Sequence, residues 1–307
     1  MTRKLRRLRA GDRIALVAPA SPFPREEVAA GAAELQRLGF ETVFDDTIFA
    51  KERFVAGSPQ SRARAIMEAW KDPSIAALVA VRGGYGSAQL LPLLDPQVMV
   101  DGRKALIGYS DITTLLAIYV RHGLPAIHGP MIDRRLSKGP SAYDEASFRR
   151  VLMTAEPPGE FAPERLEVLH AGSARGRLAG GTLTQLMASM GTPWQFDPPD
   201  NAVMFIEDIG ERPYRIHRML TQAAQAGLFA RAVAIVFGEF PGCDEPGGNP
   251  AIRDVLRDFT SDFRGPVLFN FPSGHTAGPT WTLPLGVEVE VVAQPTAAMR
   301  ILEAAVE

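Results

Sequence analysis

The stretch KALIGYSDITTLL, residues 104–116, carries the strand-turn-helix pattern on which the fold depends. An apolar strand is expected over 105–107, a Gly-Tyr-Ser-Asp turn follows at 108–111, and a helix is expected to reach about residue 121. Residues 75–94 repeat this order. The apolar run IAALVAV (75–81) is typical of a strand covered on both faces, and the turn RGGYG (82–86) precedes an expected helix over 87–94.

The rest of the first half continues the alternation. Strands are expected at 14–18, 42–44 and 125–127, and helices at 26–38 and 58–70. Alternation of this kind predicts an α/β fold with a mostly parallel sheet and helices on both faces.

The second half has a different pattern and predicts a second domain. Strands are expected at 165–169, 174–178, 203–206, 232–237, 267–269, 281–283, 287–292 and 298–302, and helices at 182–190, 213–226 and 249–259. The alternation VEVEVV (287–292) is typical of a sheet with one exposed face, so more antiparallel pairing is expected here. Proline and glycine near 157–163 mark the linker, and we divide the chain into domains at 1–160 and 161–307.

Composition supports two domains and excludes several classes of protein. The chain has 307 residues, and its 33 Lys and Arg against 35 Asp and Glu give a formal net charge of −2. This balance argues against a nucleic-acid-binding protein, which is normally strongly basic. The single cysteine, Cys243, excludes an intrachain disulfide and a cysteine-cluster metal site. No apolar stretch approaches the roughly 18 residues of a membrane helix.

The N-terminus imitates a secretory signal, because the basic segment MTRKLRRLR (1–9) precedes the apolar segment IALVAPA (14–20). The apolar segment is short, and Gly11-Asp12-Arg13 interrupts the approach to it. We therefore expect a buried first strand and a cytoplasmic protein.

Ser110 is a candidate nucleophile. It falls where a strand turns sharply into a helix, which is the geometry of a nucleophile elbow, although the elbow glycine two residues later is replaced by Ile112. The start of the helix offers unpaired backbone N–H groups for a developing oxyanion. The alternative is that Ser110 or Asp111 caps the helix, and the local sequence leaves both open.

Gly83, Gly84 and Gly86 form a second candidate site. Such a turn lets backbone N–H groups approach a ligand closely, but its pattern is neither a Walker A loop nor a dinucleotide-binding fingerprint. A plain tight turn is the alternative.

The acid and the base that a serine nucleophile needs are available in the second half. Glu207 and Asp208 end an expected strand, and His275 lies in a loop flanked by glycine and proline. Glu207 is also a candidate ion-pair partner for nearby arginines. His128 and His217 compete as bases, and His217 is expected on a solvated helix face.

Six ordered blocks of the sequence together resemble one family, the LD-carboxypeptidase (muramoyltetrapeptide carboxypeptidase) family of serine peptidases. The resemblance runs nearly end to end. The blocks are GDRIALVAPAS, VRGGYGSAQLLPLLD, ALIGYSDITTLL with a later HGPM, RLAGGTLTQLMASMGTPWQFD, VMFIEDIGERPYRIHRMLTQ and GHTAGPTWTLPLG. The segment Thr276–Pro279 after the histidine departs from the family pattern.

The resemblance implies a fold and a set of functional residues. The N-terminal domain would be a mostly parallel α/β sandwich similar to class I glutamine amidotransferases, and the C-terminal domain a swivelling β/β/α-type domain. The family's triad carries over to Ser110, Glu207 and His275. Its oxyanion hole carries over to the backbone N–H groups of Asp111 and Gly84.

The resemblance also implies an activity: removal of the terminal D-alanine from a murein tetrapeptide by cleavage of the L,D bond. This activity uses no cofactor and no metal, serves peptidoglycan recycling in the cytoplasm, and involves neither nucleic acid nor membrane. Family members often form homodimers. Because arginine suits carboxylates, substrate contacts are expected from residues of the glycine turn and of the 212–215 region. These are Arg82, Gly83, Tyr85, Arg212 and Arg215.

Two alternatives remain at this point. One is a microcin C immunity-type peptidase that cleaves peptidyl- or aminoacyl-nucleotides, in which Trp194 could stack on a base. The other is a non-catalytic, two-lobed solute-binding protein.

Overall fold

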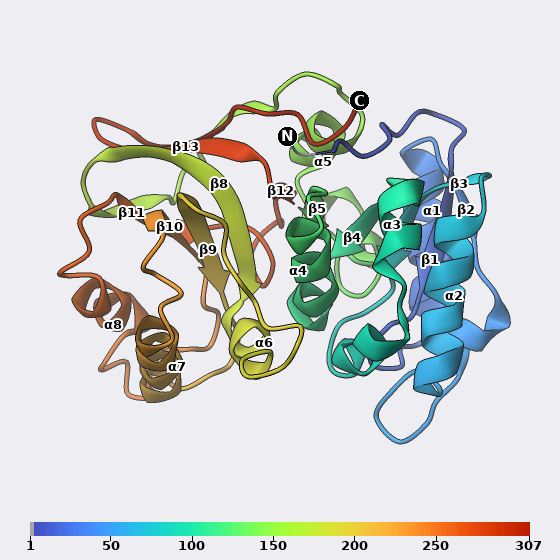
Figure 1. Ribbon diagram of the computed structural model, residues 1–307, viewed down its shortest axis with the longest axis horizontal. Coiled ribbons are helices and arrows are strands. Elements are labelled where there is room, and N and C mark those ends of the chain that lie inside the picture. The colour runs from blue at the N-terminus through green and yellow to red at the C-terminus, as the bar shows by residue number, and fades with distance from the viewer. Residues whose placement is uncertain (1–2) are drawn as a thin grey trace.

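The computed structural model describes residues 3–307, which form two sheets side by side (Figure 1). The first half of the chain builds the right-hand part of this view, and most of the second half builds the left-hand part. The predicted α/β fold in two domains is confirmed.

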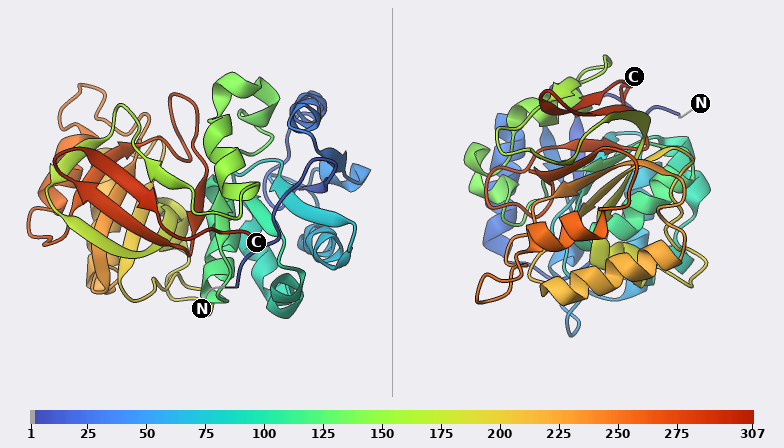
Figure 2. Two further views of the ribbon diagram at one scale, coloured as in Figure 1. Left: turned by 90° about the horizontal axis from the view of Figure 1, so that it is seen from above. Right: turned by 90° about the vertical axis from the view of Figure 1, so that its left-hand side faces the viewer.

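The first sheet has the strand order β12-β5-β4-β3-β1-β2, and β1 to β5 are parallel. Helices α1, α2 and α4 alternate with these strands along the chain and pack against them (Figures 1 and 2). Strands β3 and β4 are almost entirely buried, as their unbroken apolar runs predict. The elements are β1 (Arg13–Val17), α1 (Arg25–Arg37), β2 (Glu41–Val43), α2 (Pro59–Lys71), β3 (Ile75–Ala80), α3 (Pro96–Gly102), β4 (Ala105–Gly108), α4 (Thr113–Arg121), β5 (Ala126–His128) and α5 (Glu145–Leu152).

Short 3₁₀ helices occupy several turns of this domain. The segment expected as a helix over 87–94 is the 3₁₀ helix η2 (Ser87–Leu93), and it contains Pro92. Proline lacks the N–H of a regular α-helix, which accounts for the tighter and shorter form. The others are η1 (Asp46–Phe49), η3 (Ser110–Ile112), η4 (Leu136–Lys138) and η5 (Pro140–Ala142).

The second sheet has the order β6-β14-β13-β8-β9-β10-β11-β7. Its four central strands, β8 to β11, are parallel, so the expected antiparallel pairing is confined to the outer strands. Helices α6, α7 and α8 lie together on one side of it (Figure 1). The elements are β6 (Gly159–Phe161), β7 (Glu167–His170), β8 (Ser173–Thr182), α6 (Leu183–Ala188), β9 (Ala202–Glu207), α7 (Pro213–Gln225), β10 (Ala232–Gly238), α8 (Ile252–Phe259), β11 (Val267–Phe271), β12 (Leu283–Leu285), β13 (Glu288–Ala293) and β14 (Ala297–Ile301).

Strand β12 belongs to the first sheet although it comes from the second half of the chain. It pairs antiparallel with β5, with Pro284 opposite Ile127. The segment 272–282, which contains His275, therefore connects the two sheets. The division of the chain at residue 160 stays a prediction, and β12 is a segment that such a division would cross.

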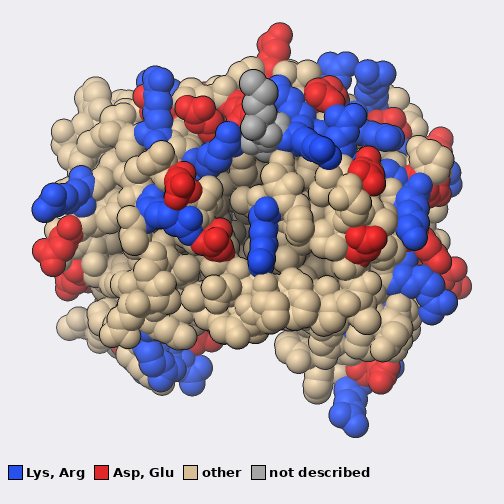
Figure 3. Space-filling model, in the orientation of Figure 1, with Lys and Arg blue, Asp and Glu red and all other residues tan. Residues whose placement is uncertain are grey.

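The apolar segment near the N-terminus is the buried strand β1, as expected. Met1 and Thr2, which begin the basic segment, lie outside the described residues. Near the start of the chain, Leu5 pairs with Val306, so the two ends of the chain lie together (Figure 1). Acidic and basic side chains are interspersed over the face shown in Figure 3. Within residues 3–307, no helix has the length and apolar character needed to span a membrane.

Candidate active site

Ser110 lies on a sharp and strained turn at the end of β4. Its φ is 58°, in the left-handed region that side chains other than glycine seldom adopt, and it begins η3, which leads directly into α4. A Cβ on Gly108 would lie 2.9 Å from the Ile112 side chain, so the turn needs glycine there. Strain of this kind is concentrated at functional sites.

The helix-cap alternative does not match the contacts of this turn. Ser110 makes no side-chain hydrogen bond within residues 3–307. The Asp111 carboxylate accepts a hydrogen bond from the Ser87 N–H at 2.7 Å, and the Ser87 hydroxyl donates to the Asp111 carbonyl at 2.5 Å. Asp111 therefore ties the nucleophile turn to the start of η2.

The glycine turn lies directly against Ser110. A Cβ on Gly83 would lie 2.9 Å from Ser110 Cβ, 3.1 Å from Ser110 Oγ and 3.4 Å from the Asp111 nitrogen, so a side chain here would displace the serine. Gly84 has a φ of 98°, and its N–H makes no hydrogen bond within the described residues. A free backbone N–H in a turn that lies against the serine is the kind of group that can serve an oxyanion.

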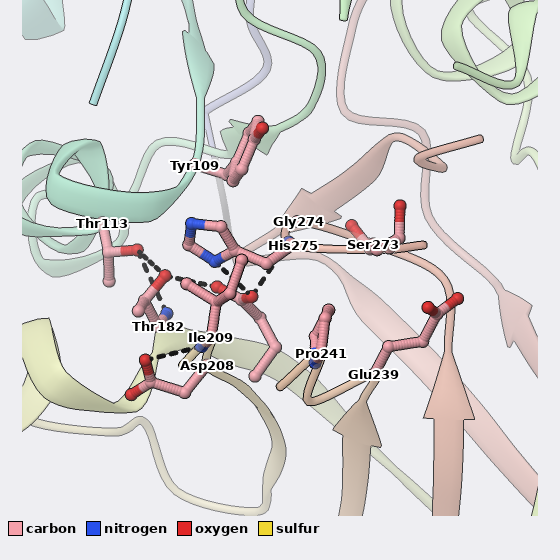
Figure 4. Close-up of polar contacts among 12 residues, drawn as sticks. Tyr109, Thr113, Thr182, Asp208, Ile209, Glu239, Pro241, Ser273, Gly274 and His275 are labelled. Atoms are coloured by element: carbon pink, nitrogen blue, oxygen red, sulfur yellow. Dashed lines mark hydrogen bonds and ion pairs between the residues drawn. The ribbon is translucent and has the colours of Figure 1, made fainter. Parts of the chain in front are cut away.

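Glu207 and His275 form a hydrogen-bonded pair between two segments of the C-terminal half, and Figure 4 shows the position of His275 near Thr182. Glu207 ends β9 and is fully buried. Its Oε2 accepts hydrogen bonds from the His275 backbone N–H at 3.0 Å and from His275 Nδ1 at 2.8 Å, while the Thr182 hydroxyl donates to Oε1. A Cβ on Gly274 would lie 2.8 Å from Glu207 Cδ, which explains a glycine before the histidine.

Glu207 and His275 shift the pKa of each other. Burial raises the pKa of Glu207, but the charge and hydrogen bond of His275, together with the hydrogen bond from Thr182, outweigh burial and hold this pKa below its usual value. Burial lowers the pKa of His275, and the Glu207 carboxylate outweighs it, so this pKa is raised. Since Nδ1 faces Glu207, Nε2 is the nitrogen left to exchange a proton with substrate or serine.

Arg135 holds the His275 loop from the N-terminal half. It is 9% exposed, and its guanidinium donates hydrogen bonds to backbone carbonyls and to the Tyr109 hydroxyl. The Tyr109 ring packs edge-on against His275, with ring centroids 5.1 Å apart. The carbonyl partners are Gly274 at 3.1 Å, Thr276 at 3.1 Å, Gly278 at 3.0 Å and Ala142 at 3.3 Å.

Ser110 and His275 line one pocket of about 340 Å³, together with Gly83 and Gly84. Acidic and basic side chains, two threonines, a glutamine and three apolar or aromatic side chains complete its wall. The other lining residues are Arg82, Tyr109, Met131, Asp133, Arg134, Thr182, Thr184, Gln185, Asp208, Ile209 and Glu211. Within residues 3–307, no cluster of three or more His, Cys, Asp or Glu is arranged to hold a metal ion.

Three of the expected substrate contacts do not line this pocket. Tyr85 is 51% exposed and packs against Phe54. The Arg212 guanidinium pairs with Glu245, and Arg215 pairs with Glu211 at 3.3 Å. Their roles toward a substrate stay predictions.

The other candidate bases, His128 and His217, and the candidate base-stacking residue Trp194 do not line the Ser110 pocket. His128 is fully buried, its Nδ1 lies 2.9 Å from Ser273 Oγ, and burial lowers its pKa to about 4, so it is a neutral core residue. His217 lies on an exposed face of α7, as expected. Trp194 lines a separate apolar pocket with Trp70.

Sequence reasoning missed several residues of the pocket. Thr182 could have been found, because it ends β8, which is parallel to β9 and places it opposite Glu207. Asp208 was noted only as Glu207's neighbour. It accepts hydrogen bonds from the N–H and hydroxyl of Thr184 at 2.9 and 2.7 Å, and burial raises its pKa to about 6. No local signal marked Arg134 or Arg135.

Comparisons with known proteins cover both halves of the chain. Residues 14–129 match the family model described as LD-carboxypeptidase N-terminal domain, and residues 175–291 match the LD-carboxypeptidase C-terminal domain. The murein tetrapeptide carboxypeptidase of Pseudomonas aeruginosa is 32% identical over 86% of this chain and 88% of its own length.

Two solved structures resemble the whole fold. The muramoyltetrapeptide carboxypeptidase from Oxalobacter formigenes superposes with a TM-score of 0.85 at 28% identity, covering 96% of this chain and 100% of that one. The microcin C7 self-immunity protein MccF in its wild-type apo state, a protein known from Escherichia coli, superposes with a TM-score of 0.92 at 26% identity, covering 99% and 100%.

Proposed function

The chain belongs to the LD-carboxypeptidase family of peptidases, and we propose that it is a serine-type hydrolase that removes the C-terminal D-alanine from a murein tetrapeptide. One observation carries the serine mechanism. A strained Ser110 and a His275 paired with buried Glu207 line the same pocket. A nucleophile, a base and an acid that orients the base are the groups that acyl transfer requires.

The reaction follows from these positions. His275 Nε2 takes the Ser110 proton as Oγ attacks the carbonyl of the bond before D-alanine, and Glu207 stabilises the resulting imidazolium. The N–H groups of Gly84 and Asp111 bind the tetrahedral oxyanion. His275 then gives its proton to the leaving nitrogen and D-alanine departs. Water, deprotonated by His275, cleaves the acyl-enzyme and restores the Ser110 hydroxyl.

The proposal also covers the substrate contacts, the cofactor requirement, the location and the oligomeric state of the enzyme. Arg82 and Gly83 line the pocket beside Ser110 and are proposed as substrate contacts, with Tyr85, Arg212 and Arg215 as outer contacts. The chemistry needs no cofactor. We place the enzyme in the cytoplasm, as a homodimer that takes part in peptidoglycan recycling.

A second function has a specific observation in its favour. The likeness to MccF covers the whole chain, so cleavage of a peptidyl- or aminoacyl-nucleotide is the alternative. Trp194 was the residue that could stack on a base, and its position outside the Ser110 pocket favours the murein peptide.

The test is release of D-alanine from purified murein tetrapeptide by the wild type and by Ser110→Ala. Wild-type release that Ser110→Ala abolishes is expected. The matched control is Ser261→Ala, an exposed serine in the turn after α8, which should keep full activity. A parallel reaction with an aminoacyl-sulfamoyl nucleotide tests the alternative. Binding without Ser110-dependent release of any product would point to a solute-binding protein instead.

A further inference from the structure

Arg134 is a strained arginine on the wall of the Ser110 pocket. Its φ is 61°, in the left-handed region, and its side chain is 73% exposed. Arginine is not a residue that favours this conformation, so the fold holds it there at a cost. The backbone N–H of Arg134 donates a hydrogen bond to Glu27 Oε2, with the two atoms 3.4 Å apart.

The guanidinium of Arg134 is held near the pocket but keeps its donors free. Its Nε lies 3.8 Å from Asp133 Oδ1, beyond hydrogen-bonding distance, and it donates no side-chain hydrogen bond within residues 3–307. Arg82 is more firmly engaged, because its Nε lies 3.3 Å from Asp133 Oδ2 and its Nη1 donates to the Pro22 carbonyl at 3.1 Å. Two arginines, Arg82 and Arg134, thus face the carboxylates of Asp133 and Glu27, and the Arg134 guanidinium is the one of the two with no side-chain hydrogen bond in the described residues.

The position of this guanidinium matches a chemical need of the proposed reaction. An enzyme that removes one residue from a chain end must bind the terminal carboxylate one residue away from the attacked carbonyl, about 3.8 Å along the backbone. Arg82 directly precedes Gly83, whose backbone lies against Ser110, so the arginine side of the pocket adjoins the nucleophile. Asp208 and Glu211 also line the pocket and offer no donor to an anion, and Glu211 is paired with Arg215.

We propose that Arg134 is the receptor for the terminal carboxylate of the peptide, and that Asp133 and Arg82 position it. A guanidinium with free donors binds a carboxylate through two parallel hydrogen bonds, and its strained backbone keeps it at the pocket. This inference rests on the proposed peptidase function and names the residue that makes the enzyme act at a free chain end.

The test compares a murein tetrapeptide with its C-terminal amide, by following the shortened tripeptide that both release. For the wild type we expect a higher kcat/KM on the free acid. Arg134→Gly relieves the left-handed strain and removes the guanidinium. It should lower kcat/KM on the free acid about 10- to 100-fold, chiefly through KM, and leave kcat/KM on the amide within about twofold. Arg134→Lys keeps the positive charge, so its kcat/KM on the free acid should lie between those of the wild type and Arg134→Gly.

The control is Arg103→Gly. Arg103 is also left-handed, with a φ of 49°, but lies at the end of α3 beside Glu307, outside the Ser110 pocket. The Arg103→Gly variant should keep the wild-type preference for the free acid over the amide. If Arg134→Gly stays folded and keeps the preference for the free acid, or loses activity on both peptides equally, the inference is wrong. A wild type that cleaves both peptides equally well also refutes it, whereas one that cleaves neither refutes the peptidase function itself.

Discussion

Replacing Arg135 by methionine should loosen the His275 loop while leaving the proposed triad residues in the chain. The Gly274 carbonyl lies in a buried residue and would lose its donor, which costs about 1–3 kcal/mol. The carbonyls of Ala142, Thr276 and Gly278 lie in more exposed residues, so water can replace the guanidinium at about 0.5–1 kcal/mol each. We expect a total loss of about 2.5–6 kcal/mol, which corresponds to a Tm roughly 5–24 °C lower.

The same change should alter the pH profile. Burial and the positive charge of Arg135 lower the pKa of His275, and Glu207 raises it. Removing Arg135 therefore raises this pKa further. Because His275 must be neutral to accept the Ser110 proton, the acidic limb of kcat/KM should move to higher pH, and kcat should fall as the loop loses its order.

Thermal unfolding and a pH series of kcat/KM on the tetrapeptide measure both effects. The control is Arg150→Met, because Arg150 also donates to backbone carbonyls, those of Pro158 and Glu160, away from the site. Arg150→Met should lower Tm without moving the acidic limb. An Arg135→Met enzyme with the Tm and pH profile of the wild type would refute the role assigned to Arg135.

Two further substitutions test the site itself. Glu207→Gln removes the charge that raises the pKa of His275, so the acidic limb should move to lower pH while kcat falls by about 10⁴, and an unchanged limb would contradict the pairing. Gly83→Ala adds a methyl group 2.9 Å from Ser110 Cβ, so kcat/KM should fall at least about 100-fold with about 1–3 kcal/mol of destabilisation. Gly247→Ala, whose methyl would meet nothing within 4 Å, is the control, and equal activity of the two variants would show that the Gly83 contact is unimportant.

The sequence was most informative where local chemistry decides the structure. Buried runs such as 75–81 and the turn at 108–111 have a pattern that depends on neighbouring residues alone, and both elements form as predicted. The position of Glu207 at the end of β9 follows from the same kind of pattern.

The sequence was least informative where distant segments meet. Strand β12 is Leu-Pro-Leu, and proline argues against a strand unless the strand lies at a sheet edge, where β12 does lie. That edge position follows only from the pairing of β12 with β5, and the two strands are more than a hundred residues apart in the sequence. Arg134 and Arg135 were missed for the same reason. Arg135 binds carbonyls of the distant segment 274–278, and Arg134 lines a pocket formed by both halves of the chain, so the residues next to them in the sequence give no sign of either role.

The return of β12 to the first sheet changes what domain motion can do to the site. A nucleophile in one domain and a base in the other would allow a hinge to separate them. The loop that carries His275 begins after β11 in the second sheet and ends at β12 in the first, and Arg135 holds its middle from the N-terminal half. Moving His275 away from Ser110 would therefore require breaking the β12–β5 pairing and the Arg135 hydrogen bonds together. We infer that the base stays with the nucleophile's domain, so that substrate entry depends on the pocket wall rather than on a hinge.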